Sequence, residues 1–348
     1  MLAAVFEGNG KLSLKERSKP ILQNDIDVLI KVSAVGICGT DLHILQVPAA
    51  HPATIGAILG HEFTGEIVEV GKQVFDFKVG DTVIVDPHPG CGVCRQCKIG
   101  RPDRCERLYS SNFPGQPQTI GIFSDGAMTS YVTVPAHSLY KISKEVPSYI
   151  AALAEPLSCV VNAASKVKVQ PGDNVVILGA GPIGLLFTCM FKASGASKVI
   201  VSEVSEYRRK IASECGAKIV VNPNNEDLRN VVKKETNGGA DIVVEAVGPL
   251  LNECINLVRA GGKVIQFGYN ELVRPEIQVA EIVRKEIVIY GSYIGKFNWG
   301  KTARIIESGI LPLDKLVSHR LPLSRIHEGI ELLRKGKGIK VIIYPEND

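Results

Sequence analysis

From residue 174 onward, short runs of β-branched residues alternate with amphipathic stretches, and this alternation limits the possible folds more than any other feature of the chain. Runs at 175–178, 199–201, 242–244 and 264–267 have the composition of buried strands, and the stretches between them favour helices. Strands that alternate with helices form a parallel sheet with helices on both faces. We therefore predict an α/β fold with a doubly wound parallel sheet over about residues 151–290.

The strand expected at 175–178 leads into a glycine-rich turn that opens the next helix. Its first glycine permits a tight turn, its second lets a pyrophosphate approach the backbone, and its third lets helix and strand pack closely. Free N–H groups at the helix start favour an anion there. The turn predicts a Rossmann dinucleotide site formed by Gly179, Gly181, Pro182, Ile183 and Gly184.

An acidic residue, Glu203, follows the next expected strand at the spacing typical of the group that binds the ribose 2′-hydroxyl. A carboxylate there repels a 2′-phosphate, so we expect NAD rather than NADP. Arg208 and Arg209 leave the alternative open, because an arginine is able to accept that phosphate. Arg208 is also placed to lie over the adenosine ribose, and both arginines fit a solvated helix face equally well.

Residues 27–140 have a different texture, with short apolar runs separated by Gly, Pro and Asp. This pattern predicts a strand-rich, partly closed barrel. After about residue 290 the chain is expected to leave the parallel sheet, with helices near 301–308 and 324–335 and a strand at 340–344 that rejoins the first domain. The predicted organisation is a catalytic domain at 1–150, a cofactor domain at 151–290 and a return to the catalytic domain at 291–348.

Four of the nine cysteines lie close together in the segment CGVCRQCKIGRPDRC. Two-residue gaps let successive thiolates turn back onto one ion, and the longer loop closes the fourth corner. Four sulfurs make a closed tetrahedral zinc site, which is structural rather than catalytic. The alternative is a loop of unrelated thiols. We predict a structural zinc held by Cys91, Cys94, Cys97 and Cys105.

A second metal site is suggested by Cys38 in GICGTDLH and by His61 and Glu62 in GHEFTGEIVEVG. Cys, His and a carboxylate suit a catalytic zinc, which keeps one exchangeable position. Glu155 in AALAEPLSC is a candidate for a further ligand. Each residue also has an ordinary explanation, such as a core thiol, a surface carboxylate or a helix cap.

The motifs GICGTDLH, GHEFTGEIVEVG, the four-cysteine segment and GAGPIG, in this order, resemble the zinc-containing medium-chain alcohol dehydrogenases along essentially the whole chain. The resemblance implies a GroES-like catalytic domain and a catalytic zinc bound by Cys38 and His61. Glu155 replaces a cysteine of the liver-type enzymes, as in sorbitol dehydrogenases and L-threonine 3-dehydrogenases. Whether Glu62 or Glu155 is the direct ligand varies in those branches. The resemblance also places Gly248 and Phe267 near the nicotinamide and Lys340 near the pyrophosphate.

The expected reaction is hydride transfer from a secondary alcohol to NAD, with zinc polarising the hydroxyl. Thr40 and His43 offer a hydroxyl and an imidazole for proton relay to solvent, an assignment that the resemblance supports. The alternative is that Thr40 caps a helix beginning at Asp41 and His43 packs on it.

Residues 42–59, expected to line the substrate pocket, contain no Lys or Arg. A neutral sugar alcohol or vicinal diol is therefore the expected substrate. L-threonine 3-dehydrogenase is the alternative function. A polyol phosphate dehydrogenase and a non-catalytic nucleotide-binding relative rank lower, the latter because every expected metal ligand is present.

Composition and charge argue against a nucleic-acid-binding, membrane or secreted protein. The net charge is +4 and the charges of both signs are scattered, so nucleic acid is not an expected partner. No apolar run approaches the ~20 residues that span a bilayer, and residues 1–7 lack a signal-peptide pattern. We expect a cytoplasmic protein that binds a small-molecule alcohol, and the resemblance implies a homotetramer.

Overall fold

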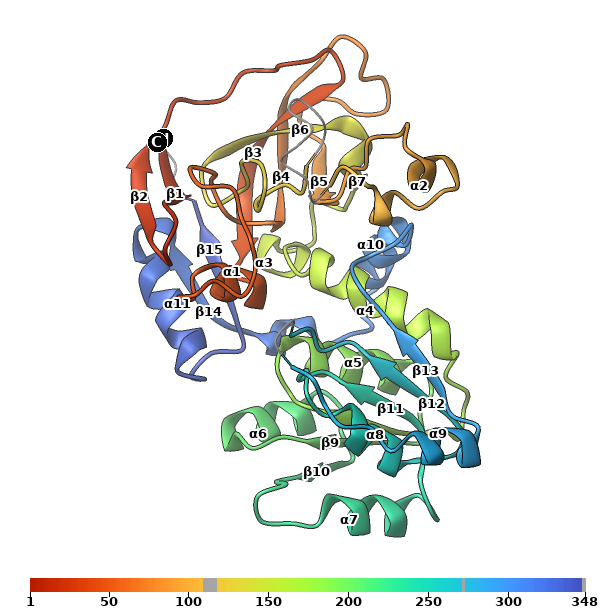
Figure 1. Ribbon diagram of the computed structural model, residues 1–348. Helices are drawn as coiled ribbons and strands as arrows, with labels where there is room; N and C mark the ends of the chain where they lie inside the picture. Colours follow the sequence, from red (N-terminus) through yellow and green to blue (C-terminus); the bar gives the residue numbers. More distant parts are fainter. Residues whose placement is uncertain (109–117, 271–272, 346–348) are drawn as a thin grey trace. The chain divides into compact units, whose positions relative to one another are not determined.

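The computed structural model describes residues 1–108, 118–270 and 273–345, and the chain divides into two units (Figure 1). The first unit comprises Met1–Ser158, Gly295–Ser308 and Val317–Asp348. The second unit comprises Cys159–Ile294 and Gly309–Leu316. Helix α4 (Ala154–Val167) begins in the first unit and ends in the second.

The first unit is built on a seven-stranded sheet in the order β14-β15-β3-β4-β5-β7, with β6 also paired to β3. All of these pairings are antiparallel except that of β14 with β15. Strands β1 and β2 form a separate antiparallel pair. The strands are β1 (Leu2–Phe6), β2 (Leu12–Glu16), β3 (Asp27–Gly36), β4 (Glu62–Val70), β5 (Thr82–Val85), β6 (Tyr131–Pro135), β7 (Leu139–Lys141), β14 (Val317–Pro322) and β15 (Lys340–Tyr344).

The helices of the first unit are short, because the chain there mostly turns between strands. Strand β3 is almost completely buried, since β4, β6 and β15 all pair with it. The core it shares with these strands includes Val28, Ile30 and Phe63. The helical segments are α1 (Gly39–Ile44), α2 (Arg95–Lys98), η1 (Pro102–Arg104), η2 (Ala136–Ser138), α3 (Ser148–Ala151), α10 (Trp299–Glu307), η4 (Leu323–Arg325) and α11 (Ile326–Arg334).

The second unit contains a six-stranded parallel sheet in the order β10-β9-β8-β11-β12-β13. The chain runs outward from β8 to one edge and then from β11 to the other, which is the strand reversal at which such sheets bind nucleotides. The strands are β8 (Asn174–Leu178), β9 (Lys198–Ser202), β10 (Ile219–Val221), β11 (Ala240–Glu245), β12 (Val258–Gln266) and β13 (Val288–Gly291). The remaining elements are α5 (Pro182–Ala193), α6 (Glu206–Glu214), α7 (Leu228–Glu235), α8 (Leu251–Leu257), α9 (Val279–Lys285) and η3 (Leu313–Leu316).

The predicted doubly wound sheet is confirmed, and so is the return of the last strand to the first unit, where β15 pairs with β3 and β14. The predicted boundaries need correction. The first unit continues to Ser158, whose carbonyl accepts a hydrogen bond from the Asn298 side chain of the same unit. The expected unbroken return over 291–348 is wrong for Gly309–Leu316, because η3 packs on α5 and α6 and buries Leu313 and Leu316.

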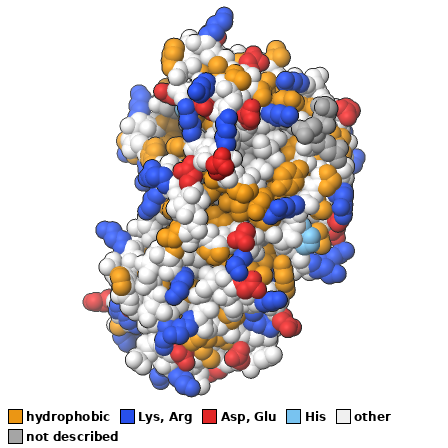
Figure 2. Space-filling model, turned by 180° about the vertical axis from the view of Figure 1, so that it is seen from behind, with side chains coloured by type: hydrophobic (Ala, Val, Ile, Leu, Met, Phe, Trp, Pro, Cys, Tyr) orange, Lys and Arg blue, Asp and Glu red, His pale blue; other side chains and the backbone are white. Residues whose placement is uncertain are grey.

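Charged side chains of both signs are intermixed over the face shown in Figure 2, as the small net charge leads one to expect. Within the described ranges, the helices are all too short or too polar to cross a bilayer.

Candidate functional site

Three of the expected metal ligands meet in the first unit at the ends of two paired strands. Cys38 follows β3 and is the N-cap residue of α1, and His61 and Glu62 stand at the start of β4. Strands β3 and β4 bring Gly36 opposite Glu62. The sulfur, imidazole and carboxylate ligand atoms of Cys38, His61 and Glu62 lie within 4.8 Å of one another.

Gly36 leaves space for the Glu62 side chain at this point of β3. A Cβ on residue 36 would collide with the carboxylate of Glu62, so the absence of a side chain leaves room for that carboxylate beside the cluster. The glycine that precedes Ile37 and Cys38 in GICGTDLH is therefore part of the geometry of the site and not only of the turn.

Asp41 supports the cluster from α1 and was not among the predicted site residues. One carboxylate oxygen, Oδ2, accepts a hydrogen bond from the backbone N–H of Cys38 at 2.8 Å. The other, Oδ1, is 3.8 Å from Nδ1 of His61. These last two atoms are buried, and neither has a hydrogen-bond partner among the described residues. A carboxylate behind a histidine orients the ring and raises its basicity as a metal ligand.

Lys340, at the start of β15, lies on the other side of Glu62. Its ammonium donates hydrogen bonds to Oε1 and Oε2 of Glu62 at 2.8 and 2.6 Å and to the carbonyl of Ile37 at 3.1 Å. All three donors of the ammonium are thus used within the first unit, and only 2% of the residue is exposed. Lys340 thus pairs with a candidate metal ligand, and its approach to the pyrophosphate stays a prediction.

Burial and neighbouring charges shift the pKa values of the groups in this cluster. Burial and the charge of Glu62 raise the pKa of the Cys38 thiol, and burial raises the pKa of Asp41. Burial opposes the charged ring of His61, but the charges of Cys38 and Asp41 prevail and raise its pKa well above the ordinary value. Groups that hold protons this close together are suited to exchange them for one divalent cation.

The other predicted catalytic residues lie on α1 and α4. The Cys38 thiol donates to the Thr40 hydroxyl at 3.6 Å. His43 is half-buried in the last turn of α1, and burial lowers its pKa. Glu155, in the first turn of α4, is 8% exposed, and its charge acts on both His61 and Lys340. Its carboxylate is not in the group of ligand atoms that meet within 4.8 Å in the described chain.

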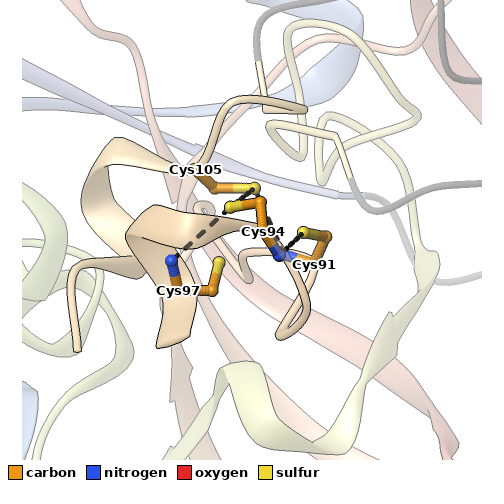
Figure 3. A group of neighbouring side chains, drawn as sticks. All are labelled: Cys91, Cys94, Cys97 and Cys105. Carbon is orange, nitrogen blue, oxygen red and sulfur yellow. Dashed lines mark hydrogen bonds between the residues drawn. The ribbon is translucent and has the colours of Figure 1, made fainter. Parts of the chain in front are cut away.

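The second candidate metal centre is the four-cysteine group, with one thiol from each of Cys91, Cys94, Cys97 and Cys105 within 4.8 Å of the others (Figure 3). Backbone N–H groups donate to three of the sulfurs, at 3.3–3.5 Å. Figure 3 shows the side chains converging from the loop and from the short helix α2. Such N–H···S contacts stabilise thiolates, which are the form that binds zinc.

The thiols of this group differ in acidity. Burial opposes ionisation of Cys94, but backbone N–H groups of Cys97 and Glu106 outweigh it and lower its pKa to about 6. Burial and the Cys94 side chain raise the pKa of Cys97 to about 12. Four sulfurs, of which Cys94 is favoured as a thiolate, suit a closed zinc site, because zinc binds the thiolate form.

In the second unit, the glycine-rich turn joins β8 to α5. Gly179 has a φ of +95°, and Gly181 is the N-cap residue of α5. A Cβ on Gly184 would collide with the carbonyl of Gly179, whereas a Cβ on Gly181 would meet no atom of the described chain within 4 Å. The open backbone at Gly181 and the free N–H groups of the first turn of α5, from Ile183 onward, form a cradle for an anion. Pro182 has no N–H to donate, but it begins the helix.

Glu203 follows β9 and reaches back to this turn. Its Oε2 accepts from the backbone N–H of Ala180 at 2.7 Å and its Oε1 from that of Ser205 at 2.9 Å. Arg209 donates to the carbonyls of Glu203 and Val204, so it holds the loop. Nε of Arg208 is buried and finds no hydrogen-bond partner in the part of the chain that is described, which leaves this donor open to a ligand.

Gly248 and Phe267, predicted to lie near the nicotinamide, follow the carboxyl ends of β11 and β12. Phe267 packs edge to face on Phe187 of α5, with ring centroids 5.3 Å apart. Glu245, the last residue of β11, is completely buried beside both and was missed in the sequence. A charged residue at the end of an apolar strand was the feature that could have revealed it.

Two protein families match this chain, one within its first unit and one mainly within its second. The family described as "Alcohol dehydrogenase GroES-like domain" matches residues 24–144, and the one described as "Zinc-binding dehydrogenase" matches residues 182–308. The L-threonine 3-dehydrogenase of Thermococcus kodakarensis is 38% identical over 333 residues, which cover 92% of this chain and 91% of that protein.

Two solved structures are similar along their whole length. A Sinorhizobium meliloti protein bound to NADP has a TM-score of 0.91 and 32% identity, with 99% of each chain covered. The 2R,3R-butanediol dehydrogenase of Bacillus subtilis has a TM-score of 0.87 and 30% identity, also with 99% of each chain covered. With these matches the resemblance predicted from the motifs is confirmed. The chain belongs to the medium-chain zinc alcohol dehydrogenases, oxidoreductases that act on CH–OH groups.

Proposed function

We propose that the chain oxidises a secondary alcohol, a sugar alcohol or vicinal diol, to the ketone with NAD as hydride acceptor. The observation that carries this proposal is that the ligand atoms of Cys38, His61 and Glu62 lie within 4.8 Å of one another, with His61 and Glu62 buried. Bound zinc supplies Lewis acidity to the hydroxyl, and bound nicotinamide supplies the hydride acceptor.

The protein's side chains would bind the two zinc ions and transfer the hydroxyl proton. Cys38, His61 and Glu62 would hold the catalytic zinc, with Glu155 as a further carboxylate, and Asp41 would orient His61. Thr40 and His43 would move the hydroxyl proton toward solvent, since both lie on α1 and His43 is only half-buried. Cys91, Cys94, Cys97 and Cys105 would hold the structural zinc.

We propose NAD as the preferred cofactor because Glu203 places a buried carboxylate at the end of β9. The pyrophosphate would lie on Gly179, Gly181, Pro182, Ile183 and Gly184. Arg208 would contact the adenosine ribose. The Sinorhizobium meliloti protein holds NADP, so measuring Kd for both nucleotides is the direct test. Tighter binding of NADP than of NAD would contradict the preference.

L-threonine is the second candidate substrate. Several of the similar proteins are L-threonine 3-dehydrogenases, at up to 38% identity. The segment 42–59 has no Lys or Arg of its own, but Arg17 and Arg334 donate to its carbonyls at Gly56 and Leu45, both at 2.9 Å. A substrate carboxylate would require a cation of this kind near the segment.

An activity panel tests the proposal. The zinc-loaded protein is assayed for NAD reduction with sorbitol, xylitol, arabitol, 2,3-butanediol and L-threonine. Turnover of a polyol or diol with little turnover of threonine supports the first candidate. Turnover of threonine alone supports the second. No turnover of any secondary alcohol, with both zinc ions and NAD bound, would overturn the proposal.

We also propose a cytoplasmic homo-oligomer. All nine cysteines are free thiols, which suits a reducing compartment. Strand β13 is an edge of the second unit's sheet, and its Val288 is 43% exposed. Val279 and Val283 of the preceding helix α9 are 65% and 72% exposed. An apolar edge of this kind favours pairing with another copy. Sedimentation velocity tests it, and a species with the mass of one chain would contradict it.

A further inference from the structure

Glu245 is a buried carboxylate with no counterion among the described residues. It ends β11 and has no exposed surface. Its Oε1 accepts hydrogen bonds from the backbone N–H groups of Val247 at 3.0 Å, Gly248 at 2.7 Å and Leu250 at 3.4 Å. Its Oε2 accepts from Nε2 of Gln266 at 2.8 Å. Every one of these donors is neutral, and no Lys, Arg or His of the described ranges forms an ion pair with it within 4.0 Å.

These contacts fix the loops at the ends of two adjacent strands. The side chain holds the loop after β11, and the backbone carbonyl of Glu245 accepts from Phe267 at 3.0 Å and Gly268 at 2.9 Å in the loop after β12. Gln266, its partner across the strands, also donates to the carbonyl of Gly268 at 3.0 Å. One residue therefore sets the shape of both loops.

The loop held by Glu245 is in direct contact with the glycine-rich turn. The backbone N–H of Ala246 donates to the carbonyl of Leu178 at 3.1 Å, immediately before Gly179. A Cβ on Gly179 would meet Cγ2 of Val247 at 2.7 Å. The Glu245 loop and the phosphate-binding turn thus share one edge of the sheet.

The position along this edge identifies which half of the cofactor is involved. A dinucleotide lies across the carboxyl ends of the strands at the point where their order reverses. Glu203, the ribose-binding candidate, follows β9 on one side of β8, while Glu245 ends β11 on the other side. The nicotinamide half therefore falls to the loops that Glu245 shapes.

We infer that Glu245 is a positioning residue for the nicotinamide half of the cofactor, and that its buried charge favours the oxidised over the reduced form. This inference rests on the proposed use of NAD. The oxidised nicotinamide ring carries a positive charge that the reduced ring lacks. The carboxylate of Glu245 has only neutral hydrogen-bond donors around it, so it attracts that positive charge through the low-dielectric protein interior. A purely structural carboxylate would affect the binding of both forms equally.

The test is the ratio of the dissociation constants of NAD⁺ and NADH, measured on the zinc-loaded protein at fixed ionic strength by titration calorimetry and NADH fluorescence. Glu245→Gln keeps the shape and removes the charge, and we expect it to raise Kd(NAD⁺)/Kd(NADH) about fivefold. Asp241→Asn is the matched control, because it removes a carboxylate from the opposite end of the same strand, and it should leave the ratio unchanged.

A second variant keeps the inference testable if the Glu245→Gln protein fails to fold. Gln266→Lys puts an ammonium beside Oε2 of Glu245 without altering the carboxylate, and it should raise the ratio in the same direction. An unchanged ratio in either folded variant overturns the inference. If the wild-type protein binds neither nucleotide, the proposed function fails instead, so the two failures are distinguishable.

Discussion

The ammonium of Lys340 donates to both carboxylate oxygens of Glu62, at 2.8 and 2.6 Å, although the two residues are 278 positions apart in the chain. Both side chains are at most 3% exposed. The pair joins the start of β15 to the start of β4, so the last strand of the protein is built into the candidate metal centre. A buried pair of this kind stabilises the fold only while both partners are present.

Replacing Lys340 by Met should therefore leave the Glu62 charge buried and unpaired. We expect the free energy of unfolding to fall by about 3–5 kcal/mol, the usual result of breaking a buried ion pair. Urea denaturation of the purified protein measures this change. We also expect bound zinc to fall from about two ions per chain towards one, since the carboxylate loses the group that orients it.

The double variant Glu62→Gln with Lys340→Met is the informative control. It removes both charges, so it should recover part of the lost stability while its zinc content stays low. Equal destabilisation by the Lys340→Met and double variants would contradict the cost assigned here to the unpaired Glu62 charge.

Asp41→Asn should weaken the metal centre without removing a ligand. The neutral amide no longer polarises His61, and loss of such a carboxylate lowers metal affinity by about 10–100-fold. Competition with a chromophoric zinc chelator gives the affinity. Asp125→Asn is the control, because Asp125 also anchors a loop, through the Ile58 N–H at 2.9 Å, but does not belong to the cluster. A similar loss of zinc affinity in both variants would show that Asp41 only stabilises the fold in general.

The sequence was sufficient for the parts of this protein that local patterns encode. The glycine-rich turn and the cysteine group depend on neighbours within a few residues, so spacing and residue type predicted them. The contacts of Lys340 and Glu245 could not be predicted in the same way. Lys340 meets Glu62 only because β15 pairs with β3, a register that no local pattern specifies. Glu245 binds donors of its own loop and of the next strand.

The pH dependence of turnover should depend on His43. Burial lowers the pKa of His43 from its ordinary value, which favours the neutral imidazole that accepts a proton, and kcat/KM should fall only as the pH drops through that lowered pKa. His43→Ala should remove this acid limb and reduce kcat by about 10²–10⁴-fold. A profile of kcat/KM from about pH 5 to 9 checks both effects. An unchanged rate and profile would exclude His43 from the relay.

Cys97→Ser should abolish the structural zinc and leave the catalytic one. Zinc analysis is expected to fall from about two ions per chain to about one, and limited proteolysis should then cleave within residues 91–105, because the segment lacks a core of its own. Cys254→Ser, which alters a buried thiol of the second unit, should keep both ions. Loss of both ions from the Cys97→Ser variant would mean that the two centres are not independent.

Alanine substitutions at the two glycines at the start of α5 should have different effects, one on stability and the other on NAD binding. At Gly184 the new Cβ would collide with the Gly179 carbonyl, so the turn must distort and the midpoint of thermal unfolding should fall. At Gly181 the Cβ meets no atom of the described chain within 4 Å and the φ of −67° is ordinary, so the fold should be unaffected. That Cβ would instead occupy the space of the pyrophosphate, and NAD should bind at least about tenfold more weakly. Calorimetric unfolding and NAD titration of the two variants separate the effects, and normal NAD affinity in a stable Gly181→Ala protein would place the pyrophosphate elsewhere.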